Sequence, residues 1–195
     1  FVKKNVLDVG CGNGWFSHWA YNMGCNVDAL DPSSDQITEA KRIDKLNKIN
    51  FMEMGAESIH KLDNIYDYIF FFNSLHHIPK NIMPACISQC KKKIKPEGSI
   101  IIVEPIAKGS FHNFVKNIDD ETEVRNYAYN VIKNCGEYNL QILKEFIYNE
   151  IKSFNSGDDC INFLAKVDKS RNSYINNNKE FLLNEFNNLS NYIDN

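Results

Sequence analysis

The sequence has no long apolar run and no strong excess of charge of either sign. No stretch approaches the ~18 consecutive apolar residues that a membrane-spanning helix needs. There is also no basic stretch followed by a cleavable apolar segment. The formal net charge is −3 over 195 residues, so no field would gather nucleic acid or acidic lipid. These absences predict a cytoplasmic protein with no membrane partner and disfavour nucleic acid as a partner.

Two common cysteine patterns are absent as well. The six cysteines form no C-x-x-C pair and show no zinc-site spacing. Cys86 and Cys90 lie four residues apart, which would place two thiols on one helix face. They share an apolar stripe at helical spacing with Ile82 and Ile94, and free cysteine packs as a small hydrophobic residue. We therefore expect core packing here and no metal site.

What the sequence does contain is a strand, a tight turn and a helix at its start, in the stretch VLDVGCGNGWFSHWA of residues 6–20. Residues 10–14 carry three alternating glycines, which is typical of a turn that binds a nucleotide. The dinucleotide fingerprint G-x-G-x-x-G would need its third glycine where this chain has Trp15, so a nicotinamide oxidoreductase is disfavoured. The P-loop pattern G-x-x-x-x-G-K-[ST] is absent too, which removes the usual kinases and GTPases.

Strand and helix signals alternate over the first two thirds of the chain. Apolar runs predict strands at residues 6–9, 27–30, 51–54, 68–72 and 99–103. Amphipathic stretches predict helices at residues 15–23, from a cap at Ser33 with Gln36 as capping-box partner, and at residues 81–95. The residues Pro96-Glu97-Gly98 are expected to separate the last helix from the fifth strand. This rhythm predicts an α/β fold with a doubly wound, mostly parallel sheet.

Beyond Glu104 the periodicity is weaker because asparagine and lysine are frequent. Helices are expected at residues 121–134, 158–167 and 179–192, a possible strand at 140–146, and an asparagine-rich linker at 170–178. No convincing last strand follows, so we expect a sheet of six strands or fewer. We also expect a single globular domain over residues 1–195, with helical additions in its C-terminal third. Because the first strand follows Phe1 so closely, an N-terminal segment is expected to be missing.

Polar residues follow every predicted strand of the sheet. In a parallel sheet, ligands bind at the carboxyl ends of the strands. The residues in question are Asp8 to Gly14, Asp31, Gly55-Ala56-Glu57, Asn73 to His77 and Glu104. Asp31 can accept hydrogen bonds from two ribose hydroxyls, and its alternative role is the N-cap of the following helix.

Five segments, in this order, resemble the class I S-adenosylmethionine (SAM) methyltransferase family: LDVGCGNG, ALDPSS, GAES, YDYIFFFNSLHHI and KKIKPEGSIIIVEP. The resemblance covers about residues 4–106. It implies the Rossmann-like class I methyltransferase fold, with a SAM-binding core in residues 1–106 and an acceptor side with helices in residues 107–195. The stretch EPIAKGSFHNFVKNIDDETEVR further resembles a small-molecule branch of that superfamily.

The resemblance also implies which residues hold SAM and its product S-adenosylhomocysteine (SAH). The methionine part would lie against Asp8, Gly10, Cys11 and Gly12, the ribose against Asp31 and Pro32, the adenine against Gly55, Ala56 and Glu57, and the methyl side against Asn73 and Ser74. Many relatives carry aspartate where this chain has Gly55. We expect Glu57 or a backbone carbonyl to replace that contact with the adenine amino group.

The implied activity is methyl transfer to a small-molecule acceptor, with a hydroxyl oxygen favoured and His77, ahead of His76, as the candidate base. The N-P-P-Y pattern of relatives that methylate planar amines is absent. Two alternatives stay open: a tRNA or protein methyltransferase, and a non-catalytic SAM-binding regulatory subunit. Candidates for acceptor contacts are Asp119, Asp120, Glu121 and Arg125, which alternatively form a helix start with an i, i+4 ion pair.

Overall fold

The computed structural model describes residues 2–45 and 47–190 of the chain. Its contacts divide the chain into two compact units. The first takes in the residues up to Pro105 together with Val124–Leu143, and the second takes in Ile106–Glu123 and the residues from Lys144 onward. The single methyltransferase domain over residues 1–195 stays a prediction. In the described part of the chain, no helix has both the length and the apolar character needed to cross a membrane.

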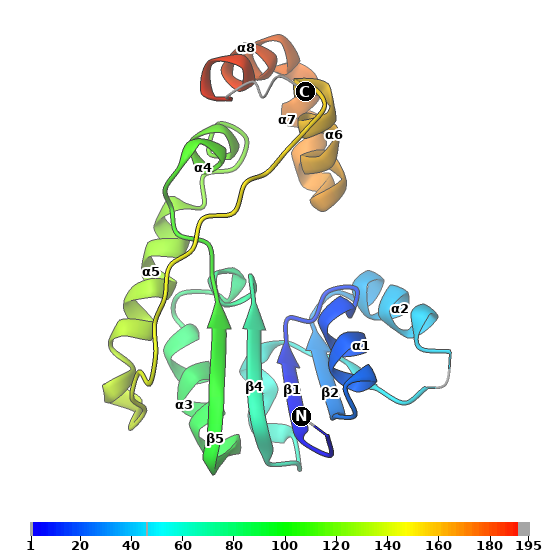
Figure 1. Cartoon of the computed structure of the whole chain (residues 1–195), viewed down its shortest axis with the longest axis vertical. Coiled ribbons are helices and arrows are strands. Elements are labelled where there is room, and N and C mark those ends of the chain that lie inside the picture. The colour runs from blue at the N-terminus through cyan, green and yellow to red at the C-terminus, as the bar shows by residue number, and fades with distance from the viewer. Residues whose placement is uncertain (1, 46, 191–195) are drawn as a thin grey trace. The chain divides into compact units, whose positions relative to one another are not determined.

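The first unit is built on a five-stranded parallel sheet with the strand order β3-β2-β1-β4-β5 (Figure 1). Its strands are β1 (Asn5–Val9), β2 (Asn26–Asp31), β3 (Asn50–Glu53), β4 (Tyr66–Phe72) and β5 (Ile94–Val103). The strand order reverses beside β1, which pairs with β2 on one edge and β4 on the other. This confirms the predicted doubly wound parallel sheet. In such sheets ligands bind where the strand order reverses, so the carboxyl ends of β1 and β4 are the expected binding position.

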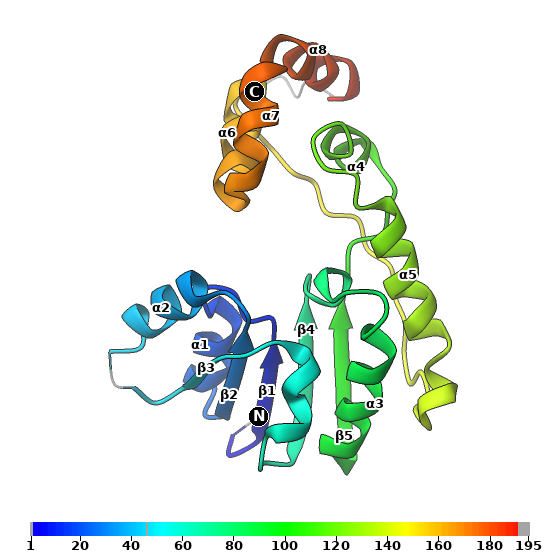
Figure 2. The same ribbon diagram turned by 180° about the vertical axis from the view of Figure 1, so that it is seen from behind.

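Helices cover both faces of the sheet. They are α1 (Trp15–Asn22), α2 (Ser34–Ile43), α3 (Met83–Lys93) and α5 (Thr122–Lys133). Side chains alternate along the strands. Val6 and Phe70 pack in one core with α1 and α2, while Leu7 and Phe71 pack in the other with α3 and α5. Figures 1 and 2 show the sheet and its helices from opposite sides.

Two local predictions for the helices are confirmed. Ser33 is the N-cap of α2, because its hydroxyl accepts the backbone N–H of Gln36. Cys86 and Cys90 lie on the buried face of α3 and are fully enclosed in the core, so their thiols pack as apolar groups.

The predicted break at Pro96-Glu97-Gly98 is wrong, because β5 begins at Ile94, directly after α3, and runs through these residues. An irregularity in the pairing of β4 with β5 accommodates them: Tyr66 lies opposite Ile94, but Tyr68 lies opposite Ser99. Proline lacks the N–H that a ladder uses, so within sheets it is confined to bulges and edge strands, and β5 is an edge strand.

The predicted strand at residues 140–146 is wrong as well. This stretch has no regular secondary structure, and Leu143 and Phe146 are more than two-thirds exposed. A β-like composition forms a strand only where a partner completes the hydrogen-bond ladder. In the described residues the sheet has five strands, in agreement with the expectation of six or fewer.

The second unit is helical. Its helices are α4 (Ser110–Val115), α6 (Gly157–Val167), α7 (Asn172–Asn177) and α8 (Lys179–Leu189), with the tail beyond residue 190 outside the described residues. The predicted linker at residues 170–178 is wrong, because α7 forms there and buries Ile175. Ile175 joins a small core with Phe114, Leu164 and Leu182, and this burial outweighs the poor helix propensity of asparagine.

Candidate functional site

The turn between β1 and α1 brings the backbone close to the loop after β4 and to β3. Gly10, Gly12 and Gly14 all have positive φ angles, of 72°, 54° and 79°. A Cβ on Gly10 would lie 2.5 Å from the Cβ of Ser74, and one on Gly14 would lie 2.8 Å from the ring of Phe51. At Gly12 the nearest atom to such a Cβ is 3.9 Å away. The outer glycines therefore permit close packing, whereas the middle one leaves its backbone accessible.

Asp31 ends β2, and two backbone groups hold its carboxylate. The Gly12 N–H donates to Oδ2 at 2.9 Å, and the Ser33 N–H donates to Oδ1 at 2.9 Å. The alternative role of Asp31 as the N-cap of α2 is wrong, because Ser33 is the N-cap. The carboxylate is fixed beside the glycine turn, and each oxygen keeps a lone pair for a further donor.

Asp8 lies in β1 and is only 1% exposed. The Ser17 hydroxyl of α1 donates a hydrogen bond of 2.5 Å to it. Burial raises the pKa of the Asp8 carboxyl to about 7; the Ser17 hydrogen bond opposes this rise and the negative charge of Asp31 adds to it. Burial likewise raises the pKa of the neighbouring Cys11 thiol, so this residue offers backbone groups and not a thiolate.

The end of β3 lies beside Asp31, since the Met54 N–H donates to the Asp31 carbonyl at 2.9 Å. Gly55 and Ala56 then lead into a short 3-10 helix, η1 (Ala56–Lys61). A Cβ on Gly55 would overlap both carboxylate oxygens of Glu57, so the carboxylate occupies the space that such a side chain would need. An acidic group is therefore present where a side chain at position 55 would stand.

The loop after β4 carries the remaining predicted site residues. Asn73 adopts a left-handed conformation with φ 50° and donates its N–H to the Val103 carbonyl at 2.8 Å. The Ser74 hydroxyl donates to the Val9 carbonyl at 2.6 Å, which ties this loop to the end of β1. A one-turn 3-10 helix, η2 (Leu75–His77), follows.

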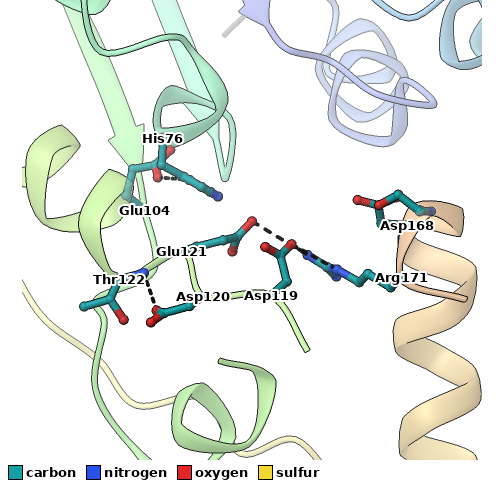
Figure 3. Close-up of polar contacts among 9 residues, drawn as sticks. His76, Glu104, Asp119, Asp120, Glu121, Thr122, Asp168 and Arg171 are labelled. Carbon is teal, nitrogen blue, oxygen red and sulfur yellow. Dashed lines mark hydrogen bonds and ion pairs between the residues drawn. The ribbon is translucent and has the colours of Figure 1, made fainter. Parts of the chain in front are cut away.

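The two histidines of η2 have different surroundings. His76 is buried, and its Nδ1 is hydrogen-bonded to the Glu104 carboxylate (Figure 3). The His77 side chain is exposed. Their ring centroids are 4.1 Å apart. Asp8, the glycine turn, Asp31, residues 55–57 and residues 73–77 thus all belong to the first unit and meet at the carboxyl edge of its sheet.

The candidate acceptor residues are distributed over both units. Asp119, Asp120 and Glu121 belong to the second unit, whereas Arg125 belongs to the first. Asp119 forms an ion pair of 2.8 Å with Arg171, and a Glu121 oxygen lies 3.7 Å from the same guanidinium (Figure 3). Asp120 accepts the Thr122 N–H at the start of α5, as expected for an acid at the positive end of a helix.

Sequence reasoning missed two roles in the first unit: the Ser17 hydroxyl that donates to Asp8, and the carboxylate of Glu104 that anchors the loop after β4. It also missed Arg171, the ion-pair partner of Asp119 within the second unit. Glu104 was recognisable as a polar residue at the end of a strand, but no spacing indicated its partners.

Parts of this chain are similar to known proteins. A family model described as a methyltransferase domain matches residues 6–98. A malonyl-[acyl-carrier protein] O-methyltransferase of Buchnera aphidicola is 32% identical over 116 residues, which are 60% of this chain and 45% of that protein. A tRNA U34 carboxymethyltransferase of Nautilia profundicola is 28% identical over 167 residues, which are 84% of this chain and 50% of that protein. The chain thus spans about half the length of these relatives.

Among solved structures, the plantazolicin methyltransferase BamL, in complex with a triazolic desmethylPZN analog and SAH, has the same fold. It aligns with a TM-score of 0.54 and 19% identity over 68% of this chain and 52% of that one. The family match, the sheet topology and the glycine turn with its acidic partner agree with one another. The chain therefore contains a class I SAM-dependent methyltransferase domain, which includes residues 6–98.

Proposed function

We propose that this chain transfers the methyl group of SAM to a hydroxyl oxygen of a small molecule. The observation that supports this acceptor is the exposed imidazole of His77, which follows β4 at the same edge of the sheet as the fixed Asp31 carboxylate. A neutral imidazole can take the proton that a hydroxyl loses as its oxygen is methylated. In this proposal, His77 is the base that accepts the proton of the hydroxyl.

The residues at the site fit SAM. The Asp31 carboxylate, with free lone pairs on both oxygens, suits two ribose hydroxyls, and Pro32 follows it. Asp8 offers a carboxyl to the amino group of the methionine part of SAM. The space beside Gly12 allows the methionine part to approach the backbone closely. Gly55, Ala56 and the Glu57 carboxylate suit the adenine, and the Asn73 side chain suits the methyl side. When bound, SAM supplies a methyl group already activated on a sulfonium.

The protein's own contribution is then mainly alignment. Holding an acceptor in line with a fixed donor can supply ~7–11 kcal/mol of the barrier reduction. A general base adds about 10²–10⁴-fold in rate. In this proposal the backbone of residues 10–14 and Asp31 fix one partner, and His77 receives the proton of the other.

The proposal predicts measurable transfer of a labelled methyl group. The purified chain is incubated with [methyl-³H]SAM and one of three acceptor types: catechol with simple phenols, dicarboxylic acid half-thioesters, or bulk tRNA. We expect label in a phenol ether and none in tRNA. Label in a carboxylate ester alone would keep a small-molecule acceptor but would contradict the hydroxyl oxygen, because an ionised carboxylate has no proton for a base to take. Label in tRNA alone would contradict the small-molecule acceptor, and SAH binding without transfer to any acceptor would favour the regulatory subunit.

A tRNA acceptor is the second candidate, because the similarity to the tRNA U34 carboxymethyltransferase extends over 84% of this chain. The net charge of −3 opposes it, since phosphate contacts need clustered lysine and arginine. A titration with tRNA at two salt concentrations separates the two candidates. Binding that weakens steeply with salt would support the tRNA acceptor.

A further prediction concerns pH. Because burial raises the pKa of Asp8 to about 7, the folded free protein holds a proton there that the unfolded chain releases near pH 4. The stability from this neutral carboxyl is thus present at low pH and is lost as the pH rises towards 7. A bound ammonium group favours the carboxylate, so SAH binding at pH 6 should release close to one proton and strengthen up to about pH 7.

Calorimetry in two buffers with different ionisation enthalpies measures this proton release. Asp8→Asn has no proton to release, so its binding heat should be the same in both buffers. Equal heats for the parent protein would show that Asp8 does not face the amino group.

A further inference from the structure

Glu104 is hydrogen-bonded to three residues of the loop that follows β4 (the β4 loop), and the spacing of residues in the sequence indicates none of these bonds. It follows β5 directly and accepts from three consecutive residues. The N–H groups of Ser74 and Leu75 donate to Oε1 at 3.0 and 2.8 Å, and Nδ1 of His76 is bonded to Oε2. The Glu104 side chain is 11% exposed and that of His76 is 3% exposed. These bonds are therefore largely shielded from water.

The chemistry of the carboxylate assigns the proton on the His76 ring. An ionised carboxylate only accepts hydrogen bonds. Two backbone donors occupy Oε1, so the bond at Oε2 requires a proton on Nδ1 of His76. In the neutral ring, Nε2 then carries the free lone pair.

The same contacts fix the loop that carries the site residues. Asn73 precedes the three donors in a left-handed conformation, and His77 follows them with its ring 4.1 Å from that of His76. The N–H groups of Ser74 and Leu75 lie at the start of η2, where no intrahelical acceptor is available. Without the Glu104 carboxylate, these two N–H groups would lose their acceptor, and Nδ1 of His76 would lose its hydrogen-bond partner.

We propose that Glu104 is a positioning residue of the methyl-transfer site. It holds the backbone of residues 74–76 and keeps the His76 proton on Nδ1, and the His76 ring in turn supports the His77 imidazole. The effect on turnover rests on the proposed function, whereas the position of the proton does not.

The test is Glu104→Gln, which keeps the shape of the side chain. The amide oxygen can still accept from Ser74 and Leu75, but the amide NH₂ must donate to Nδ1 of His76 and moves the ring proton to Nε2. Imidazole ¹⁵N NMR should show Nδ1–H in the parent and Nε2–H in the variant. An unchanged ring in the variant, or Nε2–H in the parent, would overturn the proposal.

The second part of the test measures kinetics, with the acceptor that the parent protein methylates. Glu104→Gln should lower kcat about tenfold or more while SAH affinity stays within about twofold, as expected for a group that acts on geometry in the transition state. The control Asp67→Asn removes a carboxylate that also accepts a backbone N–H, from Asn5 at 2.9 Å, at the opposite end of the sheet. It should change neither kcat nor the His76 spectrum.

A double-mutant cycle covers the case in which Glu104→Gln loosens the fold. His76→Phe keeps the ring contact with His77 but removes the bond to Glu104. If Glu104 acts through His76, adding Glu104→Gln to this background should change kcat by less than about twofold. Additive losses would refute this route. If the parent methylates nothing, the proposed function fails, and the NMR result alone decides the role of Glu104.

Discussion

Replacing Asp31 with alanine is expected to weaken SAH binding about tenfold or more. Charge-assisted hydrogen bonds contribute ~1.5–3 kcal/mol each, and ~1.4 kcal/mol corresponds to a factor of ten in affinity. In the structure the Gly12 and Ser33 N–H groups hold the Asp31 carboxylate in place before any ligand binds. The ribose hydroxyls therefore bind to a carboxylate that is already oriented, and binding does not have to order it. The alanine variant lacks this carboxylate.

Calorimetric titration with SAH measures this loss. Asp35→Ala is the matched control, because Asp35 is an exposed acid in the first turn of α2, four residues away. It should bind SAH within about twofold of the parent. Thermal unfolding of both variants separates a lost contact from a disturbed turn, since Asp31 also anchors the Gly12 backbone. Unchanged affinity in a folded Asp31→Ala protein would remove the ribose role.

Much of the cofactor half of the site was predictable because its determinants are local. The glycine turn, the apolar strands and the acidic residue after β2 each occupy a short segment. In a parallel sheet, the ends of such strands necessarily meet at one edge. Predicted strands 6–9, 27–30, 51–54 and 68–72 agree with β1 to β4 to within two residues at each end. Local pattern and chain direction are enough to bring Asp8 and Asp31 to the same edge.

The predictions that were wrong have the opposite cause, because they concern structure that depends on pairing between distant segments. Residues 140–146 have the composition of a strand, but no neighbouring edge completes their ladder in the structure. Pro96 was expected to separate a helix from a strand, although an irregular pairing with β4 accommodates it. Neither outcome can be derived from a window of a dozen residues.

The adjacent histidines show the same limit at the level of chemistry. From the sequence, His76 and His77 are adjacent residues after a strand; His77 is favoured as the base, but nothing in the sequence indicates a partner for either ring. Only the fold brings Glu104, 28 positions away from His76, into contact with one of them. The buried ring becomes a hydrogen-bonded support, and the exposed ring is left as the candidate for contact with an acceptor.

Replacing His77 with alanine is expected to lower turnover about 10²-fold or more and to leave SAH affinity within about twofold. A hydroxyl acceptor must lose its proton as the new carbon–oxygen bond forms, and in the proposed site the His77 imidazole receives it. Initial rates at saturating SAM measure the loss, and calorimetry with SAH measures the affinity. Retention of full turnover would assign the catalysis to alignment alone.

A second variant separates a base from a packing residue. His77→Gln keeps a polar side chain of similar reach but cannot accept the proton at neutral pH, so it should be as slow as the alanine variant. Added imidazole should restore part of the activity to His77→Ala, because that variant leaves room for a diffusible base, and should restore less to His77→Gln. If glutamine preserves turnover, or imidazole rescues neither variant, the ring of His77 contributes contacts and not proton transfer. Glu104 would then act on the shape of the loop alone.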